Sequence, residues 1–273
     1  RGPLPWTPTA HMKISALLCA AAAAPGYAAV GMLCGAATKR PLIAAILFWP
    51  SFEENTAALK VLASPLPVLR EMFTELEQKG VSAYVLSQHF FKGCNVLGCA
   101  AAALIAANAI AAEAQRGTLE IFLLRPLSRR RLLLERWLTG AIQVSVPVLL
   151  TTLTIPLFLS QVDESLALGP LMLCAVHQCL FLLSLFSVTF LFSTMGRAPL
   201  HLAFAVLVFI IFNFSIYMVK TVTHMSVFRL ADMETFLEIY EKGALPLGVT
   251  AGILVLIGGC LWGSLSVFER RVP

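Results

Sequence analysis

The stretch that decides the fold is GCNVLGCAAAALIAANAIAA, which runs from Gly93 to Ala112 and ends at Glu113. It is 20 residues long and holds no charged side chain. A helix of about 20 apolar residues covers the hydrocarbon core of a bilayer. The stretch therefore predicts a helix that crosses a membrane.

Four further uncharged runs follow along the chain. They cover residues 137–160, 166–193, 198–219 and 245–268. The first of them carries Pro147 and Pro156, which a membrane helix tolerates because neighbouring helices satisfy the freed carbonyl groups. Together with residues 93–112 they predict five spans. Because these runs are uncharged, we expect no charged side chain in them that would select an ion.

The composition agrees with a single membrane domain over residues 1–273. Apolar residues make up 58% of the chain, charged residues 13%, and the mean hydropathy is +0.82. A soluble domain of this length could not bury so much apolar surface. The net charge of +5 comes from basic residues gathered in short loops, so topology explains it better than nucleic-acid binding does.

The seven cysteines predict buried, reduced thiols, because they lie mostly in the apolar runs and form no CxxC pair. Cys174 and His177 lie one turn apart, but two ligands fall short of the usual four-ligand shell. We expect no metal site.

The region of residues 12–92 is expected to hold the first span or spans and an outer loop. An apolar run from Ile14 to Ala36 is followed by Lys39-Arg40 and a shorter apolar run from Pro41 to Phe52. If only one run crosses the membrane, Lys39-Arg40 lies on the outer side, although basic residues concentrate on the cytoplasmic side. If both runs cross, Lys39-Arg40 is cytoplasmic and the amino terminus lies outside. We favour about six spans in total.

Basic loops mark the cytoplasmic side of a membrane protein. The loop of residues 113–136 holds six arginines, the later loops alternate in charge, and the chain ends near Arg270-Arg271. This pattern predicts a multi-pass protein of the cell's inner (plasma) membrane with a cytoplasmic carboxyl terminus.

Two amphipathic helices are expected in the outer loops. The first carries an apolar face at helical spacing, made of Leu66, Leu69, Phe73 and Leu76. The second has Leu230, Met233, Leu237 and Tyr240 on one face and Glu234, Glu238 and Glu241 on another. We expect both helices to have only a packing role in these loops. A role as a substrate gate is the alternative.

The turn chemistry of the loop of residues 113–136 predicts a short helix at the membrane surface. Gly117 provides a break, Thr118 can cap a helix, and Pro126 stops the apolar turn between them. Glu113 and Arg116, three residues apart, are expected to pair. The alternative is a basic loop that only anchors the topology.

The order of residues in this loop resembles the ABC-2 class of exporter permeases. The matching residues are Glu113, Gly117, Thr118, Leu123, Leu124, Pro126, Ser128 and Arg129. The resemblance covers residues 88–273 and implies that the loop docks on an ATP-binding subunit. The implied coupling residues are Glu113, Arg116, Gly117, Thr118, Leu123, Leu124, Pro126, Ser128, Arg129, Arg130 and Arg131. This chain has the neutral Ala114 and Gln115 where the family carries a second charge, which weakens the electrostatic part of that contact.

The resemblance implies a permease subunit of an ATP-driven exporter that works as a homodimer or heterodimer among membrane lipids. The sequence contains no G-x-x-x-x-G-K-[ST] motif, so ATP and Mg²⁺ are expected on the partner ATP-binding subunit and no cofactor on this chain. Polar residues inside the spans are candidates to line the pathway: Asn95, Asn108, His177, Gln178 and Asn213. Alternatively, they make hydrogen bonds between helices. An apolar pathway suits lipids, hydrophobic drugs or a lipid-linked product.

Two other functions fit the same composition. The sequence Phe52-Glu53-Glu54 is similar to the paired glutamates of membrane-embedded CAAX-type proteases, but His177 and Asn213 show no recognisable spacing to complete such a site. A membrane scaffold without transport is the other alternative.

Overall fold

The computed structural model describes residues 78–119, 128–160, 164–219 and 221–270. Within these ranges every regular element is a helix, and five helices are long and apolar enough to cross a membrane. The predicted all-α membrane fold is confirmed. The amino-terminal span or spans and the helix expected near Leu66 to Leu76 lie outside the described residues.

The first described span is one continuous helix in three parts. These are α5 (Val81–Leu86), a π-helical part η1 (Ser87–Gly98) and α6 (Cys99–Ala109). The helix begins at Val81 and not at Gly93 as predicted, so Lys92 lies inside it. The expectation of uncharged spans is wrong here, because a lysine is a good helix former and its aliphatic stem packs in apolar surroundings.

The second described span, α9 (Arg129–Leu159), also begins earlier than predicted. The Ser128 hydroxyl accepts a hydrogen bond from the Arg131 backbone N–H at 3.3 Å and so caps its first turn. The second part of the predicted coupling loop is therefore helical. Pro147 and Pro156 lie within α9, as the sequence predicted.

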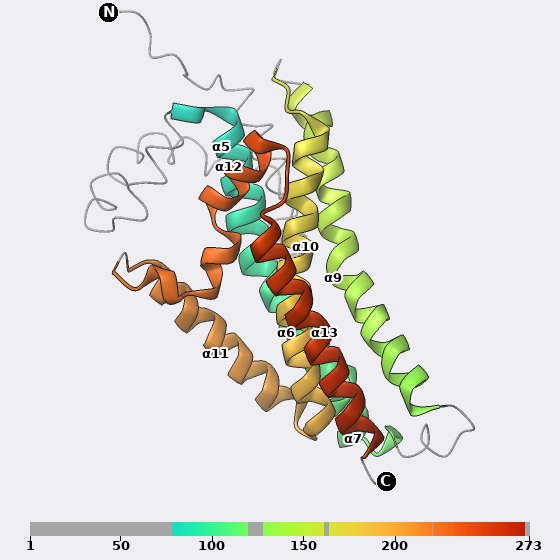
Figure 1. The fold of residues 1–273 in the computed structure, drawn as a ribbon. Coiled ribbons are helices and arrows are strands. Elements are labelled where there is room, and N and C mark those ends of the chain that lie inside the picture. The colour runs from blue at the N-terminus through green and yellow to red at the C-terminus, as the bar shows by residue number, and fades with distance from the viewer. Residues whose placement is uncertain (1–77, 120–127, 161–163, 220, 271–273) are drawn as a thin grey trace, which may run out of the picture.

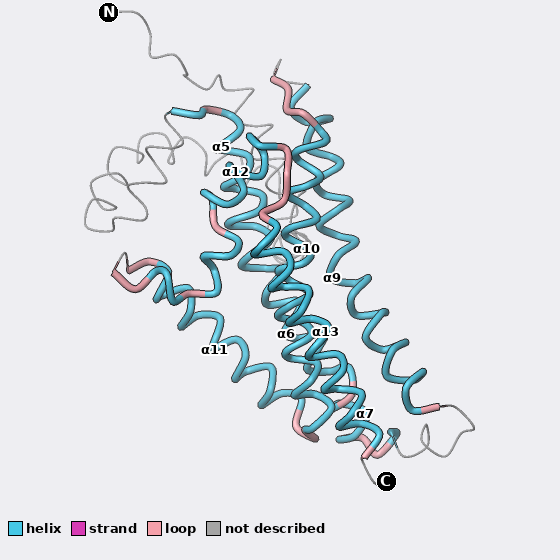
Figure 2. Tube along the Cα trace, viewed as in Figure 1, coloured by secondary structure: helices cyan, strands magenta, loops and turns pink. Residues whose placement is uncertain are grey.

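The helix α10 (Leu168–Met195) is the centre of the bundle. It packs against α6, α9, α11 (Pro199–Tyr217) and α13 (Leu247–Glu269). Of its most apolar stretch 61% is buried, against 22% in α11 and in α13, which therefore lie at the outer edge of the bundle. Figure 1 shows α11 along one side of the bundle and α13 across its front. Figure 2 shows loops at both ends of this bundle and, after α11, part-way along it.

A non-helical break separates α6 from the short α7 (Ala111–Gln115). The Ser193 hydroxyl of α10 accepts hydrogen bonds from the backbone N–H groups of Ile110 and Ala111, at 3.3 and 3.0 Å, and donates to the Ala107 carbonyl at 3.0 Å. Backbone groups without water need such partners. One hydroxyl thus holds the break against the central helix.

Close packing of α9 on α10 depends on Gly140. A Cβ atom there would overlap the ring of Phe186, which is fully buried and stacks on Phe190 with 5.7 Å between ring centroids. Trp137, one turn earlier, donates its indole N–H to the Ser187 hydroxyl at 3.1 Å. The ring of Phe186 is therefore enclosed and has little room to move.

Replacing Gly140 by alanine should destabilise the bundle by about 1–3 kcal/mol, because the methyl group overpacks the site. The midpoint of thermal unfolding of the purified chain in detergent measures this. The matched control is Gly252→Ala in α13, where a Cβ meets nothing within 4 Å. Equal midpoints for the two variants would contradict the packing described here.

Candidate functional site

The two ends of the bundle differ in charge. The end that holds α7, the start of α9 and the end of α13 is basic among its described residues (Figure 1). It carries Arg116, Arg129, Arg130, Arg131, Arg136, Arg197 and Arg270 against Glu113, Glu135 and Glu269. The opposite end is acidic by the same count, with Glu164, Asp232, Glu234, Glu238 and Glu241 against Lys79, Arg229 and Lys242.

At the basic end, Glu113 of α7 makes an ion pair with Arg136 of α9. The predicted partner was Arg116, but that residue is at the end of α7 and is exposed. The Glu113 side chain is only 16% exposed, so a partner from a neighbouring helix meets it where α9 packs beside α7. The pair joins two helices where the sequence had predicted a contact within one.

Gly117 and Thr118 form the turn that ends α7. Gly117 has a φ of 72°, in the left-handed region that favours glycine, so the predicted break is present. The Thr118 hydroxyl donates to the Glu113 carbonyl at 3.3 Å and thus satisfies the end of α7. Leu123, Leu124 and Pro126 lie outside the described residues.

The arginines at the start of α9 hold the end of α13. Arg129 donates to the backbone carbonyl of Glu269 at 3.1 Å, and Arg130 pairs with the Glu269 carboxylate. Arg131 pairs within α9 with Glu135 at 2.8 Å and remains largely exposed. Cations are favourable at a helix carboxyl end, where carbonyls lack partners. These particular partners could not be predicted, because they are about 140 residues apart along the chain.

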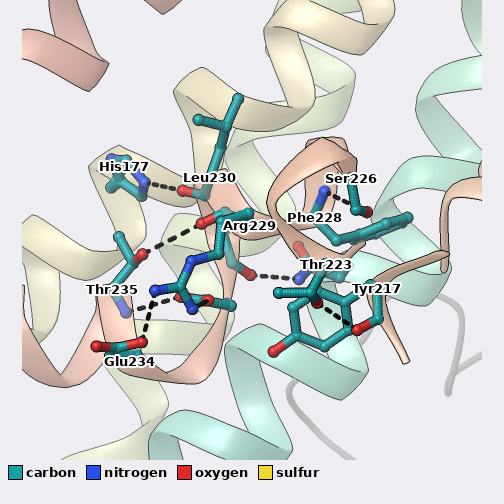
Figure 3. Close-up of polar contacts among 12 residues, drawn as sticks. His177, Tyr217, Thr223, Ser226, Phe228, Arg229, Leu230, Glu234 and Thr235 are labelled. Atoms are coloured by element: carbon teal, nitrogen blue, oxygen red, sulfur yellow. Dashed lines mark hydrogen bonds and ion pairs between the residues drawn. The ribbon is translucent and has the colours of Figure 1, made fainter. Parts of the chain in front are cut away.

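At the acidic end, a segment that is not α-helical follows α11 and enters the bundle. It contains two short 3-10 helices, η3 (Thr223–Met225) and η4 (Val227–Ala231), and leads into α12 (Met233–Lys242). Its backbone is bonded by side chains of the spans, some of which are shown in Figure 3. The part of it that precedes α12, residues 221–232, is called the inserted segment below.

Two of the predicted pathway residues, Asn95 and His177, bind the inserted segment, and a third, Gln178, holds the Asn95 side chain. Asn95 donates to the Ala231 carbonyl at 2.7 Å, and Gln178 donates to the Asn95 side-chain oxygen at 2.9 Å. His177 donates to the Leu230 carbonyl at 2.7 Å (Figure 3). All three side chains are fully buried. They make hydrogen bonds across the bundle, and a pathway role for them stays a prediction.

The other two predicted residues differ from each other. Asn213 is buried, and its side-chain oxygen accepts a hydrogen bond from the Val227 N–H at 3.4 Å. Its backbone carbonyl accepts a hydrogen bond from the Ser226 hydroxyl at 2.8 Å. Asn108 is exposed on α6 and donates only to the Leu104 carbonyl of its own helix, at 2.8 Å. Of the five candidates, Asn108 is the one that faces outward.

The helix α12 has the predicted amphipathic character. Met233 and Leu237 are buried, whereas Glu234, Glu238 and Glu241 are exposed. Its outer face is tied to the start of the first span by an ion pair between Glu241 and Lys79 at 2.8 Å. The predicted outer helix therefore packs on the bundle.

Asp232 caps the start of α12. Its carboxylate accepts from the Thr235 N–H at 2.8 Å and pairs with Arg229 at 2.7 Å. Burial raises the pKa of Asp232 above its ordinary value, since desolvation outweighs these two contacts. Arg229 also pairs with Glu234 at 2.8 Å, as Figure 3 shows.

The described residues include no group of three His, Cys, Asp or Glu side chains placed to hold a metal ion. The five described cysteines, Cys94, Cys99, Cys174, Cys179 and Cys260, are free thiols.

Replacing Asn95 by leucine should destabilise the protein by about 1–3 kcal/mol, because the Ala231 carbonyl and the Gln178 amide would be left buried without partners. The unfolding midpoint and the rate of proteolysis at the exposed Lys242 measure the effect. Asn108→Leu is the control, since that amide is exposed. If both variants behave alike, Asn95 does not hold the inserted segment.

Comparison with known proteins gives one match. Residues 17–241 match the family model described as ABC-2 family transporter protein. Searches among curated proteins and among solved structures found no match. Because the family model covers most of the chain, this protein belongs to the ABC-2 family of transporter proteins.

Proposed function

We propose that the chain is the permease subunit of an ATP-driven exporter and that a separate ATP-binding subunit docks at its basic end. Membership of the ABC-2 family supports a membrane permease. The sequence has no P-loop motif, which supports a separate chain as the source of ATP hydrolysis. ATP and Mg²⁺ would then bind on that partner.

The observation that carries this proposal is the linkage of three helices at the basic end. Glu113 of α7 pairs with Arg136 of α9, and Arg130 of α9 pairs with Glu269 of α13. A displacement of the Gly117 turn would therefore pass to α9 and α13 together. This is what a coupling element requires.

The charge difference between the ends supports the orientation. Basic residues accumulate on the cytoplasmic side of membrane proteins. The basic end, with the carboxyl terminus, would then face the cytoplasm, and the inserted segment would face outward. The protein would be a multi-pass protein of the inner (plasma) membrane.

A pair of permeases, identical or different, is the proposed assembly. The edge helices α11 and α13 present large apolar side chains, including Phe204, Ile211, Val255 and Trp262, each at least 66% exposed. Such surfaces suit lipid and a second permease. The pathway would lie along the side of the first described span that carries the exposed Asn108.

Gly117→Ala tests the coupling role, because alanine in the left-handed region costs about 1–2 kcal/mol. In a reconstituted complex with the ATP-binding subunit, the permease-dependent part of ATP hydrolysis should fall by about tenfold. The matched control is Gly243→Ala at the opposite end. Gly243 has a φ of 61°, and neither glycine has an atom within 4 Å of a built Cβ.

Both variants thus introduce the same backbone strain at different ends of the molecule. A loss of hydrolysis that is equal in the two variants, or absent from Gly117→Ala, would contradict coupling at the basic end.

A further inference from the structure

The first described span and α10 pack against each other and are joined by side-chain hydrogen bonds at two levels. Near the basic end, the Ser193 hydroxyl accepts from the Ile110 N–H at 3.3 Å. Toward the opposite end, the Gln178 amide donates to the Asn95 side-chain oxygen at 2.9 Å. Both bonds join residues that are 83 positions apart in the sequence. The two helices therefore run in the same direction and keep one register between these levels.

The two helices are also in close contact between the two levels. A Cβ atom on Gly98 would come within 2.7 Å of the Leu182 side chain, so the backbone of the first span lies directly against α10. The side chains of Asn95, Gln178 and Ser193 are fully buried. Buried hydrogen bonds at both levels, with close packing between them, resist sliding of one helix along the other. We call these two helices the registered pair.

One end of the registered pair holds the break that leads into α7. The Ser193 hydroxyl contacts both sides of this break, because it donates to the Ala107 carbonyl in α6 and accepts from the Ala111 N–H in α7, each at 3.0 Å. The Gly117 turn ends α7 one helix turn further on. A displacement of that turn therefore reaches Ser193, and through it α10.

The other end of the registered pair holds the inserted segment. Both of its helices contribute, since Asn95 donates to the Ala231 carbonyl and His177 donates to the Leu230 carbonyl, each at 2.7 Å. Figure 3 shows the bond from His177. On α10, Ser193 lies 16 residues after His177, which is about 24 Å along a helix. The registered pair thus extends from the coupling region to residues 230 and 231.

The preceding residues of the inserted segment are bonded to a different helix, α11. The Ser226 hydroxyl donates to the Asn213 carbonyl at 2.8 Å, and the Val227 N–H donates to the Asn213 side-chain oxygen at 3.4 Å. The inserted segment is therefore bonded to α11 at residues 226–227 and to the registered pair at residues 230–231. A shift of the pair relative to α11 must be taken up by the backbone between these points.

We propose that the registered pair moves as one body when the Gly117 turn is displaced, and that the inserted segment responds at residues 227–231. Ser193 is then the positioning residue that passes the displacement from α7 to α10. Packed helices and buried hydrogen bonds are the contacts through which distant sites influence each other. The inference rests on the proposed permease function, because it states how an ATP-binding subunit at the basic end would regulate the opposite end of the molecule.

Hydrogen exchange measured by mass spectrometry tests this in the wild-type permease bound to its ATP-binding subunit. The complex is compared without nucleotide and with ADP and vanadate. Exchange of the backbone amides of residues 227–231 should differ about tenfold between the two states, as expected when local opening changes by about one net hydrogen bond. Permease-dependent ATP hydrolysis is measured on the same sample.

These two readouts separate the inference from the proposed function. Equal exchange at residues 227–231 in a complex that shows permease-dependent hydrolysis would overturn the inference and leave the permease function standing. Absence of permease-dependent hydrolysis would contradict the permease function itself, and the inference with it.

Ser193→Ala tests the positioning role. The variant should abolish the nucleotide-dependent difference at residues 227–231, because α7 is no longer bonded to α10. It should still bind the ATP-binding subunit, since Ser193 is buried. A loss of stability alone would raise exchange in both nucleotide states alike and would keep their ratio.

Ser184→Ala is the matched control. Ser184 is also a buried serine of α10, but its hydroxyl donates to the Phe181 carbonyl of the same helix, at 2.6 Å. This variant should keep the nucleotide-dependent difference of the wild type. A difference that survives in Ser193→Ala, or that is lost equally in Ser184→Ala, would overturn the role of Ser193.

Discussion

The structure depends on one constraint, which is that backbone N–H and carbonyl groups in a hydrocarbon environment must find partners inside the protein. An α-helix meets this constraint by itself along its length, but the inserted segment, which is not α-helical, does not. Its carbonyls at Leu230 and Ala231 are bonded by His177 and Asn95, and its turn at Val227 is bonded by Asn213. These buried side chains therefore decide where a non-helical segment can enter the bundle.

The same constraint shapes the opposite end. The break between α6 and α7 is satisfied by the Ser193 hydroxyl, and the end of α7 by Thr118. Because these contacts are specific, α7 has a fixed position against α10, and the Glu113 and Arg136 pair extends that contact to α9. The basic end is thus a connected unit, whereas the edge helices α11 and α13 keep most of their apolar surface outward.

Much of the fold could be predicted because span length and loop charge are local properties of the sequence. The helices α10, α11 and α13 follow uncharged runs, and the amphipathic α12 follows its 3.6-residue pattern. The predicted start of the first described span, Gly93, was wrong because Lys92 was taken as the last residue of the preceding loop. The partners of Glu113 and Asn95 could not be predicted, since they are distant along the chain and depend on how helices pack.

The central claim is that a separate ATP-binding subunit docks at the basic end. Site-specific photocrosslinking in cells measures this directly, with a benzoylphenylalanine placed at Arg131, which is 70% exposed, or at Glu238 at the other end. The account predicts that the Arg131 position, and not the Glu238 position, crosslinks to a P-loop ATPase identified by mass spectrometry. Crosslinking of such an ATPase from Glu238, or its absence from Arg131, would contradict the account.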